Sequence, residues 1–257
     1  RVFRNEGVDT KHNPELTMLE AYAAYSDYHG MALLFEKVLT GVAAELGVLG
    51  KTIKFADREV ALVPDPATGL LKFRRTTLPD LWLQHLGEDI HLSLKGKGFD
   101  SQGLRELAAR KGVGHGAEVP DAKVFDALFE RHIECHMPEP TFVFDHPTAI
   151  TPLAKCKPGD ESLVERFELF FAGMEFANAY TELNDPLDQA GRFEEQAKQK
   201  AGGHVEAELL DKDFVDAMEH GMPPTGGIGF GIDRLTMLFT DTTTIREVIL
   251  FPTLKPE

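Results

Sequence analysis

The order of apolar and polar positions along the first 50 residues predicts two strands followed by a helix. Short strands are expected over residues 1–6 and 15–25, joined by a polar, turn-rich loop over residues 7–14. Residues 26–46 carry apolar side chains at helical spacing, with Gly47 near the end of the segment. A hairpin with a long connection and a following helix is the simplest arrangement.

The pattern changes between residues 50 and 139, where short apolar segments alternate with glycine- and proline-containing breakers. Helices are predicted there over residues 79–86, 101–110 and 121–135. This stretch predicts a mostly helical insertion at about residues 50–140.

The remainder of the chain returns to strands and ends in helices. Strands are expected over residues 141–144, 164–171 and 174–183, with a turn at residues 172–173 between the last two. Further helices are expected over residues 186–200, 213–219 and 231–239, and a rigid turn over 223–227 precedes a short strand. Hairpin-joined strands with inserted and appended helices indicate an α+β fold with an antiparallel sheet, since a doubly wound parallel sheet needs regular strand–helix alternation.

Composition narrows the functional classes. The 257 residues are 42% apolar, which supplies a sizeable core, and 27 Lys+Arg against 42 Asp+Glu give a net charge of −15. That balance argues against a free-standing nucleic-acid clamp or a membrane-adsorbing domain, because both need positive surface. An enzyme whose nucleic-acid contacts lie on another domain stays open.

The cysteines and the N-terminus bear on location. Cys135 and Cys156 cannot build a disulfide framework and fit a reducing compartment, so we expect a cytoplasmic protein. No apolar run approaches the roughly 18 residues of a membrane helix. The chain starts with neither a methionine nor a signal-peptide pattern, and we expect it to begin partway through a longer protein.

Polar side chains at strand spacing mark candidate chemistry at both ends of the chain. Arg4 and Glu6 would share one strand face, and so would Glu20 and Tyr22. Cross-strand salt bridges would explain such pairs taken alone.

A second polar cluster lies far along the chain. Asn178, Tyr180 and Glu182 have period-two spacing, which makes a poor core surface and a good pocket floor. Glu168 stands among aromatic residues and needs a partner or a metal to offset its desolvation, and Glu175 follows shortly after. The alternative is that these acids face solvent.

The third feature is a glycine-rich segment over residues 226–231 that leads to Arg234. Glycines let the backbone approach a ligand closely, and an arginine at a helix start favours anions. The spacing does not fit a dinucleotide-binding fingerprint.

Taken together, these segments resemble a known family. RNE (4–6) with HNPE (12–15) resembles motif 2 of the class II aminoacyl-tRNA synthetases, and GFGIDR (229–234) resembles their motif 3. TMLEAY (17–22), FELF (167–170) and TELNDP (181–186) look closer to lysyl-tRNA synthetases than to their aspartyl or asparaginyl relatives. The resemblance implies ATP-dependent activation of lysine and its transfer to tRNA(Lys), with Mg²⁺ as cofactor.

The resemblance also implies residue roles. Arg4 would hold the α-phosphate and the lysine carboxylate, and Arg234 the γ-phosphate. Glu6 and His12 would contact the nucleotide, and Leu16 stands where the family usually has an adenine-stacking Phe. Magnesium would be held by Glu168 and Glu175.

Lysine recognition has a physical argument beside the resemblance. An ammonium group removed from water needs compensating negative charge, and Glu20 and Glu182 are the candidates. Tyr22 and Tyr180 would flank the aliphatic stem, with Asn178 as a further polar contact.

The resemblance predicts one class II catalytic domain over residues 1–257, incomplete at its N-terminus. Motif 1 and an anticodon-binding domain would precede it, so most tRNA contacts would lie outside this chain. A homodimer of the full-length protein is expected.

Alternatives stay open at this point. A non-catalytic relative or fragment could keep the fold as a binding or regulatory module, and a related ligase could attach lysine-type groups to a protein acceptor. His132 and His136, at i and i+4 with Cys135 between them, could build a zinc site or simply form an exposed helix face.

Overall fold

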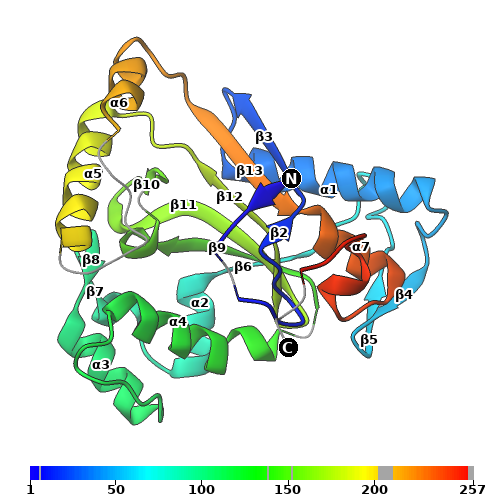
Figure 1. The fold of residues 1–257 in the computed structure, drawn as a ribbon, viewed down its shortest axis with the longest axis horizontal. Helices are drawn as coiled ribbons and strands as arrows, with labels where there is room; N and C mark the ends of the chain where they lie inside the picture. Colours follow the sequence, from blue (N-terminus) through cyan, green and yellow to red (C-terminus); the bar gives the residue numbers. More distant parts are fainter. Residues whose placement is uncertain (6, 138, 152, 202–210, 254–257) are drawn as a thin grey trace.

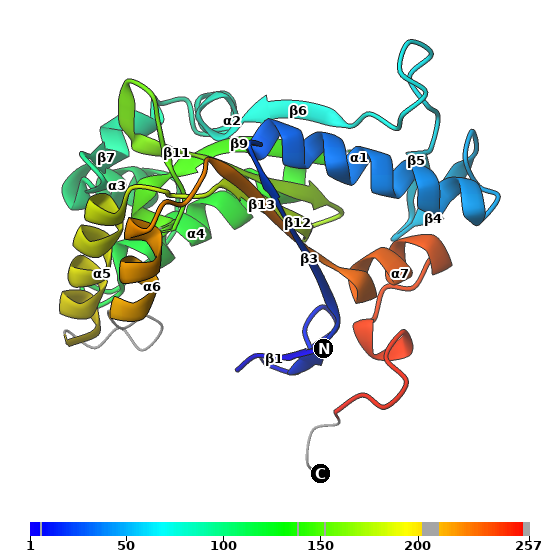
Figure 2. The ribbon, with the colours of Figure 1, turned by 90° about the horizontal axis from the view of Figure 1, so that it is seen from above.

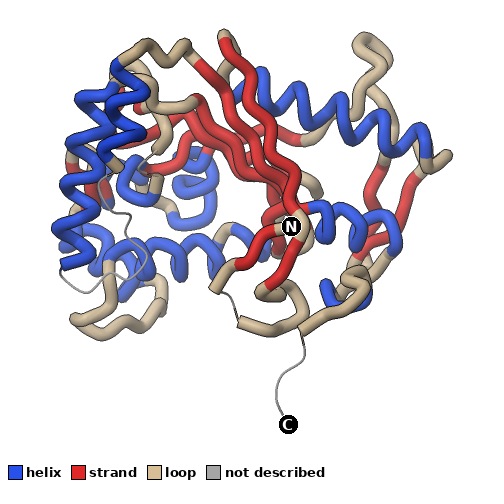
Figure 3. Tube along the Cα trace, turned by 45° about the horizontal axis from the view of Figure 1, so that its top comes forward, coloured by secondary structure: helices blue, strands red, loops and turns tan. Residues whose placement is uncertain are grey.

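The computed structural model describes residues 1–5, 7–137, 139–151, 153–201 and 211–253. Its centre is a mostly antiparallel sheet that crosses the molecule between groups of helices (Figures 1 and 3). The strand order is β3 (Met18–Ala24), β13 (Thr225–Gly231), β12 (Met174–Thr181), β11 (Asp160–Phe171), β9 (Thr141–Pro147) and β6 (Arg74–Thr77), and β10 (Cys156–Lys157) pairs with β11. Only the β6–β9 pair is parallel among these neighbours in the described residues. The expected α+β fold with an antiparallel sheet is confirmed.

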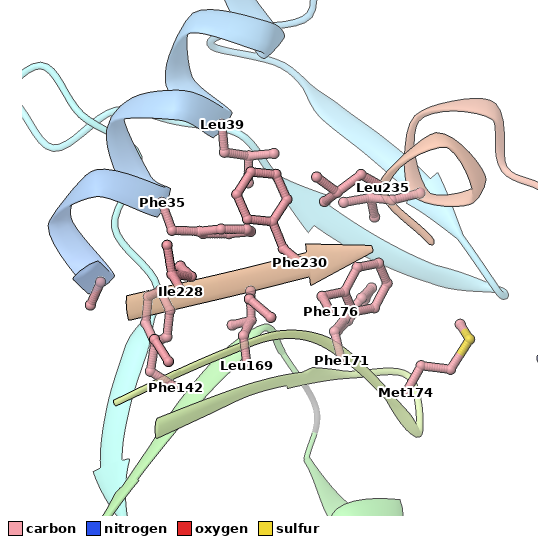
Figure 4. Close-up of a cluster of buried hydrophobic side chains, with 14 of the residues drawn as sticks. Phe35, Leu39, Phe142, Leu169, Phe171, Met174, Phe176, Ile228, Phe230 and Leu235 are labelled. Atoms are coloured by element: carbon pink, nitrogen blue, oxygen red, sulfur yellow. The ribbon is translucent and has the colours of Figure 1, made fainter. Parts of the chain in front are cut away.

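Helix α1 (Tyr28–Glu45) covers one face of this sheet, together with α7 (Ile232–Thr240) and the hairpin of β4 (Thr52–Phe55) and β5 (Arg58–Ala61). Asp27 caps α1 by accepting a hydrogen bond from the Gly30 amide. Phe35 of α1 packs edge-on against Phe230 of β13, with ring centroids 5.4 Å apart (Figure 4). Packing against α1 therefore buries one face of β13 and β12 and holds these strands in place.

The opposite face is only partly covered. Helices α2 (Leu78–Leu86), α3 (Ser101–Arg110) and α4 (Asp121–His132) form a second core in which Trp82 stacks on Phe125. Val143 of β9 and Phe170 of β11 join this core, whereas their sequence neighbours point to the α1 side. Among the described residues, no side chain of β3, β12 or β13 belongs to the second core, so the pocket face of those strands is left for other contacts.

Smaller elements complete the described chain. They are the hairpin of β1 (Val2–Phe3) and β2 (Glu15–Leu16), the hairpin of β7 (Leu94–Lys95) and β8 (Gly98–Phe99), the helices α5 (Pro186–Ala201) and α6 (Lys212–Glu219), and 3-10 turns at Ile90–Ser93, Glu134–His136, Thr148–Ile150 and Ile245–Glu247. Figure 2 shows β1 and α1 on opposite sides of the main sheet. None of the helices in the described ranges is both long and apolar enough to cross a membrane.

Most predicted elements are confirmed to within a few residues, including the three helices between residues 50 and 140 and the turn at Ala172 and Gly173. The segment between residues 50 and 140 also holds strands that were not predicted. Strand β6 joins the main sheet beside β9, and the β4–β5 hairpin packs against α7.

Three predicted boundaries are wrong. The first strand is only Val2–Phe3, and the second is divided at Thr17, whose backbone N–H donates to Asp233 Oδ2 (2.6 Å) and whose carbonyl accepts from Ile232. The chain therefore changes partner from β1 to β13 at this residue. The predicted turn over residues 223–227 ends earlier, because Thr225, Gly226 and Gly227 already pair with β3 and β12.

Candidate active site

The open face of β3, β13 and β12 brings the sequence-predicted polar residues side by side. Glu20 and Asn178 both lie opposite Gly229 in the strand register, on either side of it. Tyr22 and Tyr180 flank Gly227 in the same way. The two residues of each pair lie on strands two positions apart in the sheet, so their backbones are about 10 Å apart. Side chains 158 residues apart in sequence thus lie on one surface.

Glycines in the middle strand leave the space between these rows. A methyl group at Gly227 would collide with the carboxylate of Glu182 and the ring of Tyr22. Ile228 and Phe230, the residues between the glycines, point into the α1 core instead. The alternation of small and bulky residues in β13 therefore builds a core on one face and an empty floor on the other.

A β-bulge carries Glu175 onto the same face. Leu169 of β11 pairs with Ala177, but the next residue, Phe170, pairs with Glu175, so Phe176 is an extra residue in β12. Phe176 packs into the α1 core near Phe55. The inserted residue reverses the alternation, and Glu175 faces the cavity despite its odd spacing from Asn178.

A cavity of about 990 Å³, open to solvent, lies over this floor. Ten of the predicted site residues line it: Arg4, His12, Leu16, Glu20, Tyr22, Glu175, Asn178, Tyr180, Glu182 and Arg234. Glu168 lines a different cavity, and Glu6 lies outside the described residues. The structure thus brings together nearly all of the described candidates.

The two predicted arginines meet at one end of the cavity. Arg234, in the first turn of α7, donates from Nη1 to the Glu175 carbonyl oxygen (2.5 Å). Arg4 reaches the same end from the residues after β1, where Nη2 lies 3.3 Å from Met18 Sδ. Burial raises the pKa of Glu175, and the positive charges of Arg4 and Arg234 both lower it. Both guanidinium groups therefore interact electrostatically with the same carboxyl group.

The loop between β1 and β2 contributes His12. Its Nδ1 lies 2.9 Å from an Asp9 carboxylate oxygen, and the Asp9 carboxylate also accepts from the backbone amides of Lys11 and His12 (2.7 Å each). The hydrogen bond from His12 is the main cause that lowers the pKa of Asp9 to about 2. A charged Asp9 therefore holds the imidazole at the cavity edge.

Comparison with known proteins places this arrangement in a family. The family model described as "tRNA synthetases class II (D, K and N)" matches residues 1–255. The chain belongs to this family of class II tRNA synthetases. The cavity of this synthetase domain is thus formed by the segments that resemble motifs 2 and 3.

Curated relatives of this synthetase domain share one printed name. The chain is 44% identical to a lysine–tRNA ligase of Nostoc sp. over 265 residues, which cover 100% of this chain and 44% of the relative. It is 44% identical to the lysine–tRNA ligase of Enterococcus faecalis (99% of this chain, 49% of the relative) and 46% identical to that of Parasynechococcus marenigrum (100% and 49%). The chain spans about half the length of the curated relatives it matches.

The other end of the synthetase cavity is acidic. Burial raises the pKa of Glu182 to about 7, and its buried Oε1 has no hydrogen-bond partner among the described residues. Burial is the main cause that raises the pKa of Tyr22, and the negative charges of Glu182 and Glu20 raise it further. The phenol therefore interacts electrostatically with both carboxylates. A cationic group bound between Glu182, Glu20 and Tyr22 would stabilise the ionised form of the Glu182 carboxylate, which burial disfavours.

Glu168 and Glu175 form a close acidic pair in this synthetase domain. Burial is the main cause that raises the pKa of Glu175, and repulsion from Glu168 is the next. Arg166 forms an ion pair with Glu168, and His146 Nδ1 lies 3.9 Å from the other Glu168 oxygen. Two mutually repelling carboxylates provide the hard oxygen ligands that Mg²⁺ prefers, so these residues fit that cation.

The zinc alternative is wrong for this synthetase domain. Helix α4 ends at His132 and a 3-10 turn follows, so His132 and His136 do not share a helix face. His132 Nε2 lies 3.2 Å from the Lys111 carbonyl oxygen, and His136 stacks on His85. In the described ranges, no group of three or more His, Cys, Asp or Glu residues could hold a metal ion.

Sequence reasoning missed two cationic residues of the site. Lys11 lines the cavity and donates to the Gly173 carbonyl oxygen (2.7 Å), which ties the β1–β2 loop to the β11–β12 turn. Its place beside His12 in a candidate loop was the available signal. Arg166 lies beside the cavity floor on the neighbouring strand β11, and its position two residues before Glu168 was the corresponding signal.

Proposed function

We propose that the chain carries the amino-acid activation site of a lysine–tRNA ligase. In the proposed reaction a lysine carboxylate oxygen attacks the α-phosphorus of ATP, the bond to the β-phosphate oxygen breaks, and lysyl-adenylate and pyrophosphate form. The lysyl group then passes from the adenylate to a hydroxyl of tRNA(Lys), and AMP leaves. The carboxylate is already a nucleophile, so alignment and charge neutralisation rather than a general base account for the rate.

The arginine end of the cavity suits the triphosphate. Arg4 would hold the α-phosphate and the lysine carboxylate through its planar fork of donors, and Arg234 would hold the γ-phosphate. Glu6 and His12 would contact the nucleotide. Leu16 lines the same cavity and would give the adenine an apolar contact without ring stacking.

The acidic end suits the lysine side chain. Glu20 and Glu182 would compensate the ammonium group, and the unpartnered oxygen of Glu182 supports this role. Tyr22 and Tyr180 would flank the aliphatic stem, and Asn178 would donate to a ligand oxygen. The positions of the two carboxylates would then set the accepted side-chain length.

Glu168 and Glu175 would hold Mg²⁺, which when bound neutralises phosphate charge. The repulsion between the two carboxylates supports the assignment. The positive charges of Arg166, Arg234 and Arg4 lower the pKa of Glu175 and so oppose the effect of its burial.

We further propose that residues 1–257 are one class II catalytic domain with a mostly helical insertion at about 50–140. The tRNA(Lys) contacts would lie mostly outside this chain, in a cytoplasmic homodimer of the longer protein. The match to curated lysine–tRNA ligases over 99–100% of the chain supports this proposal.

The observation that carries the function is a single cavity with arginines at one end and paired carboxylates at the other. Lysine-dependent exchange of labelled pyrophosphate into ATP tests it, with arginine, ornithine and aspartate as competing substrates. Exchange with lysine alone is expected. Equal exchange with ornithine would contradict the length-measuring role of the carboxylates, and silence from a folded sample would favour the non-catalytic module.

Lysyl-adenylate formed without transfer to tRNA(Lys), but with transfer to a protein, would favour the protein-acceptor alternative. Transfer assays with each acceptor separate these outcomes.

A further inference from the structure

Arg166 of β11 lies beside the cavity floor, opposite Tyr180 in the strand register, and each of its three guanidinium nitrogens has a different acceptor. Nε donates to Asn178 Oδ1 (3.0 Å), Nη1 donates to Thr151 Oγ1 (2.6 Å), and Nη2 donates to the Glu168 carboxylate. Its side chain is 12% exposed. One partly buried cation thus contacts a candidate lysine contact, a candidate metal ligand and a threonine outside both sets.

The contact with Asn178 fixes the direction of its amide. Since Oδ1 accepts from Arg166, the NH₂ end is the part of the amide that can donate to a ligand in the cavity. Rotation of the amide by 180° would bring its NH₂ group against a guanidinium donor. Arg166 therefore determines whether Asn178 offers a donor or an acceptor.

The contact with Glu168 fixes a carboxylate and its charge. Arg166 takes one oxygen of Glu168, while the other lies 3.9 Å from His146 Nδ1. Arg166 is therefore the side chain that holds the Glu168 carboxylate in place.

Thr151 makes the arrangement more than an ion pair. Its side chain is buried and follows the 3-10 turn Thr148–Ile150, so it anchors the guanidinium plane from outside the sheet. A simple salt bridge between Arg166 and Glu168 would need only one acceptor and would leave the guanidinium plane free to rotate. Three acceptors at three nitrogens hold the fork in one orientation.

We propose that Arg166 is a positioning residue that sets Asn178 for lysine and Glu168 for magnesium-bound ATP at once. This inference rests on the proposed function. Arg166 touches neither substrate; it acts through the two side chains it holds. A lysine at this position would keep the charge but cannot keep three acceptors in one plane.

The test is to measure, by calorimetry, the dissociation constants of lysine and, separately, of ATP with Mg²⁺ for the Arg166→Lys protein. Both dissociation constants are expected to rise about tenfold, because a charged, bidentate-type hydrogen-bonding fork is lost. Thr151→Val, which removes only the anchor of the plane, is expected to change both in the same direction by a smaller factor. Arg105→Lys is the matched control, since Arg105 is also a forked, half-buried guanidinium but belongs to α3 and contacts Asp121 and Val119.

Double-mutant cycles separate positioning from a general structural role. In an Asn178→Ala background, Arg166→Lys should no longer change lysine affinity, and in a Glu168→Gln background it should no longer change the affinity for ATP with Mg²⁺. Additive losses in both backgrounds would overturn the role, as would unchanged affinities in a folded Arg166→Lys protein. Thr151→Val keeps the test open if Arg166→Lys does not fold. Failure of the unmutated chain to bind lysine would overturn the proposed function and this role with it.

Discussion

Glu182 is the residue on which the proposed lysine recognition would depend most. Its Oε1 is buried without a described partner, and burial alone is the cause that raises its pKa to about 7. An ammonium group bound there would be stabilised by a carboxylate that the empty site leaves uncompensated. The charge of this side chain and its raised pKa give separate predictions.

Glu182→Gln removes the charge and keeps the size. The loss of a desolvated charge pair should weaken lysine by ~3 kcal/mol, or about a 100-fold rise in the lysine KM for pyrophosphate exchange. The ATP KM should change little, because the arginine end is untouched. Glu45→Gln, at the exposed end of α1, is the control and should match the unmutated chain; normal activation of lysine by Glu182→Gln would refute the role.

The raised pKa of Glu182 predicts a pH dependence with a definite sign. Below pH 7 the empty site holds a protonated, neutral carboxyl, and lysine must displace that proton to gain an ionised partner. The lysine KM should therefore rise as pH falls, by about tenfold from pH 8 to pH 6. In Glu182→Gln this part of the profile should be flat, and an equal slope in both proteins would assign the titration to another group.

At the scale of elements, strand β13 divides its residues between core and cavity. Phe35 and Phe230 pack on one side, and Gly227 and Gly229 leave room on the other. Bulk on the glycine side should therefore harm binding more than folding, and lost bulk on the phenylalanine side should harm folding.

Gly227→Ala tests the cavity side. The added methyl group would meet the Glu182 carboxylate and the Tyr22 ring, so lysine affinity should fall by about tenfold or more as both are displaced. Gly41→Ala in α1 is the matched control, since no atom lies within 4 Å of the new methyl group. That change should stabilise the helix by up to about 1 kcal/mol and leave lysine binding as it was; equal lysine affinity in both variants would contradict the packing argument.

Phe35→Ala tests the core side. Phe35 is 1% exposed and meets Phe142 and Phe230 edge-on, so its truncation should lower the free energy of unfolding by about 3–5 kcal/mol. Urea titration measures the change. A loss below about 1 kcal/mol would mean that α1 does not hold the sheet as described.

Periodicity predicted the helices and most strands because apolar spacing depends on local sequence alone. It did not predict the bulge at Phe176, since whether a residue is extra depends on the partner strand. It also missed β6, whose parallel partner β9 is distant in sequence, and the change of partner at Thr17. Arg166 was missed because its importance lies in three acceptors that only the fold brings together.

At the scale of the molecule, one sheet face serves two purposes. Helices α2, α3 and α4 cover it at β9 and β11, and the remaining strands carry the cavity. The overall charge of −15 does not describe this cavity, whose lining includes the cationic side chains of Arg4, Lys11 and Arg234. A local concentration of cations within an acidic domain is what a triphosphate site requires.

The most direct test of this account is a crystal structure of the chain with lysine and a non-hydrolysable ATP analogue. The account predicts the triphosphate between Arg4 and Arg234 and the lysine ammonium within hydrogen-bonding distance of Glu182, over the glycines of β13. A lysine bound with its ammonium at the arginine end, or outside this cavity, would contradict it.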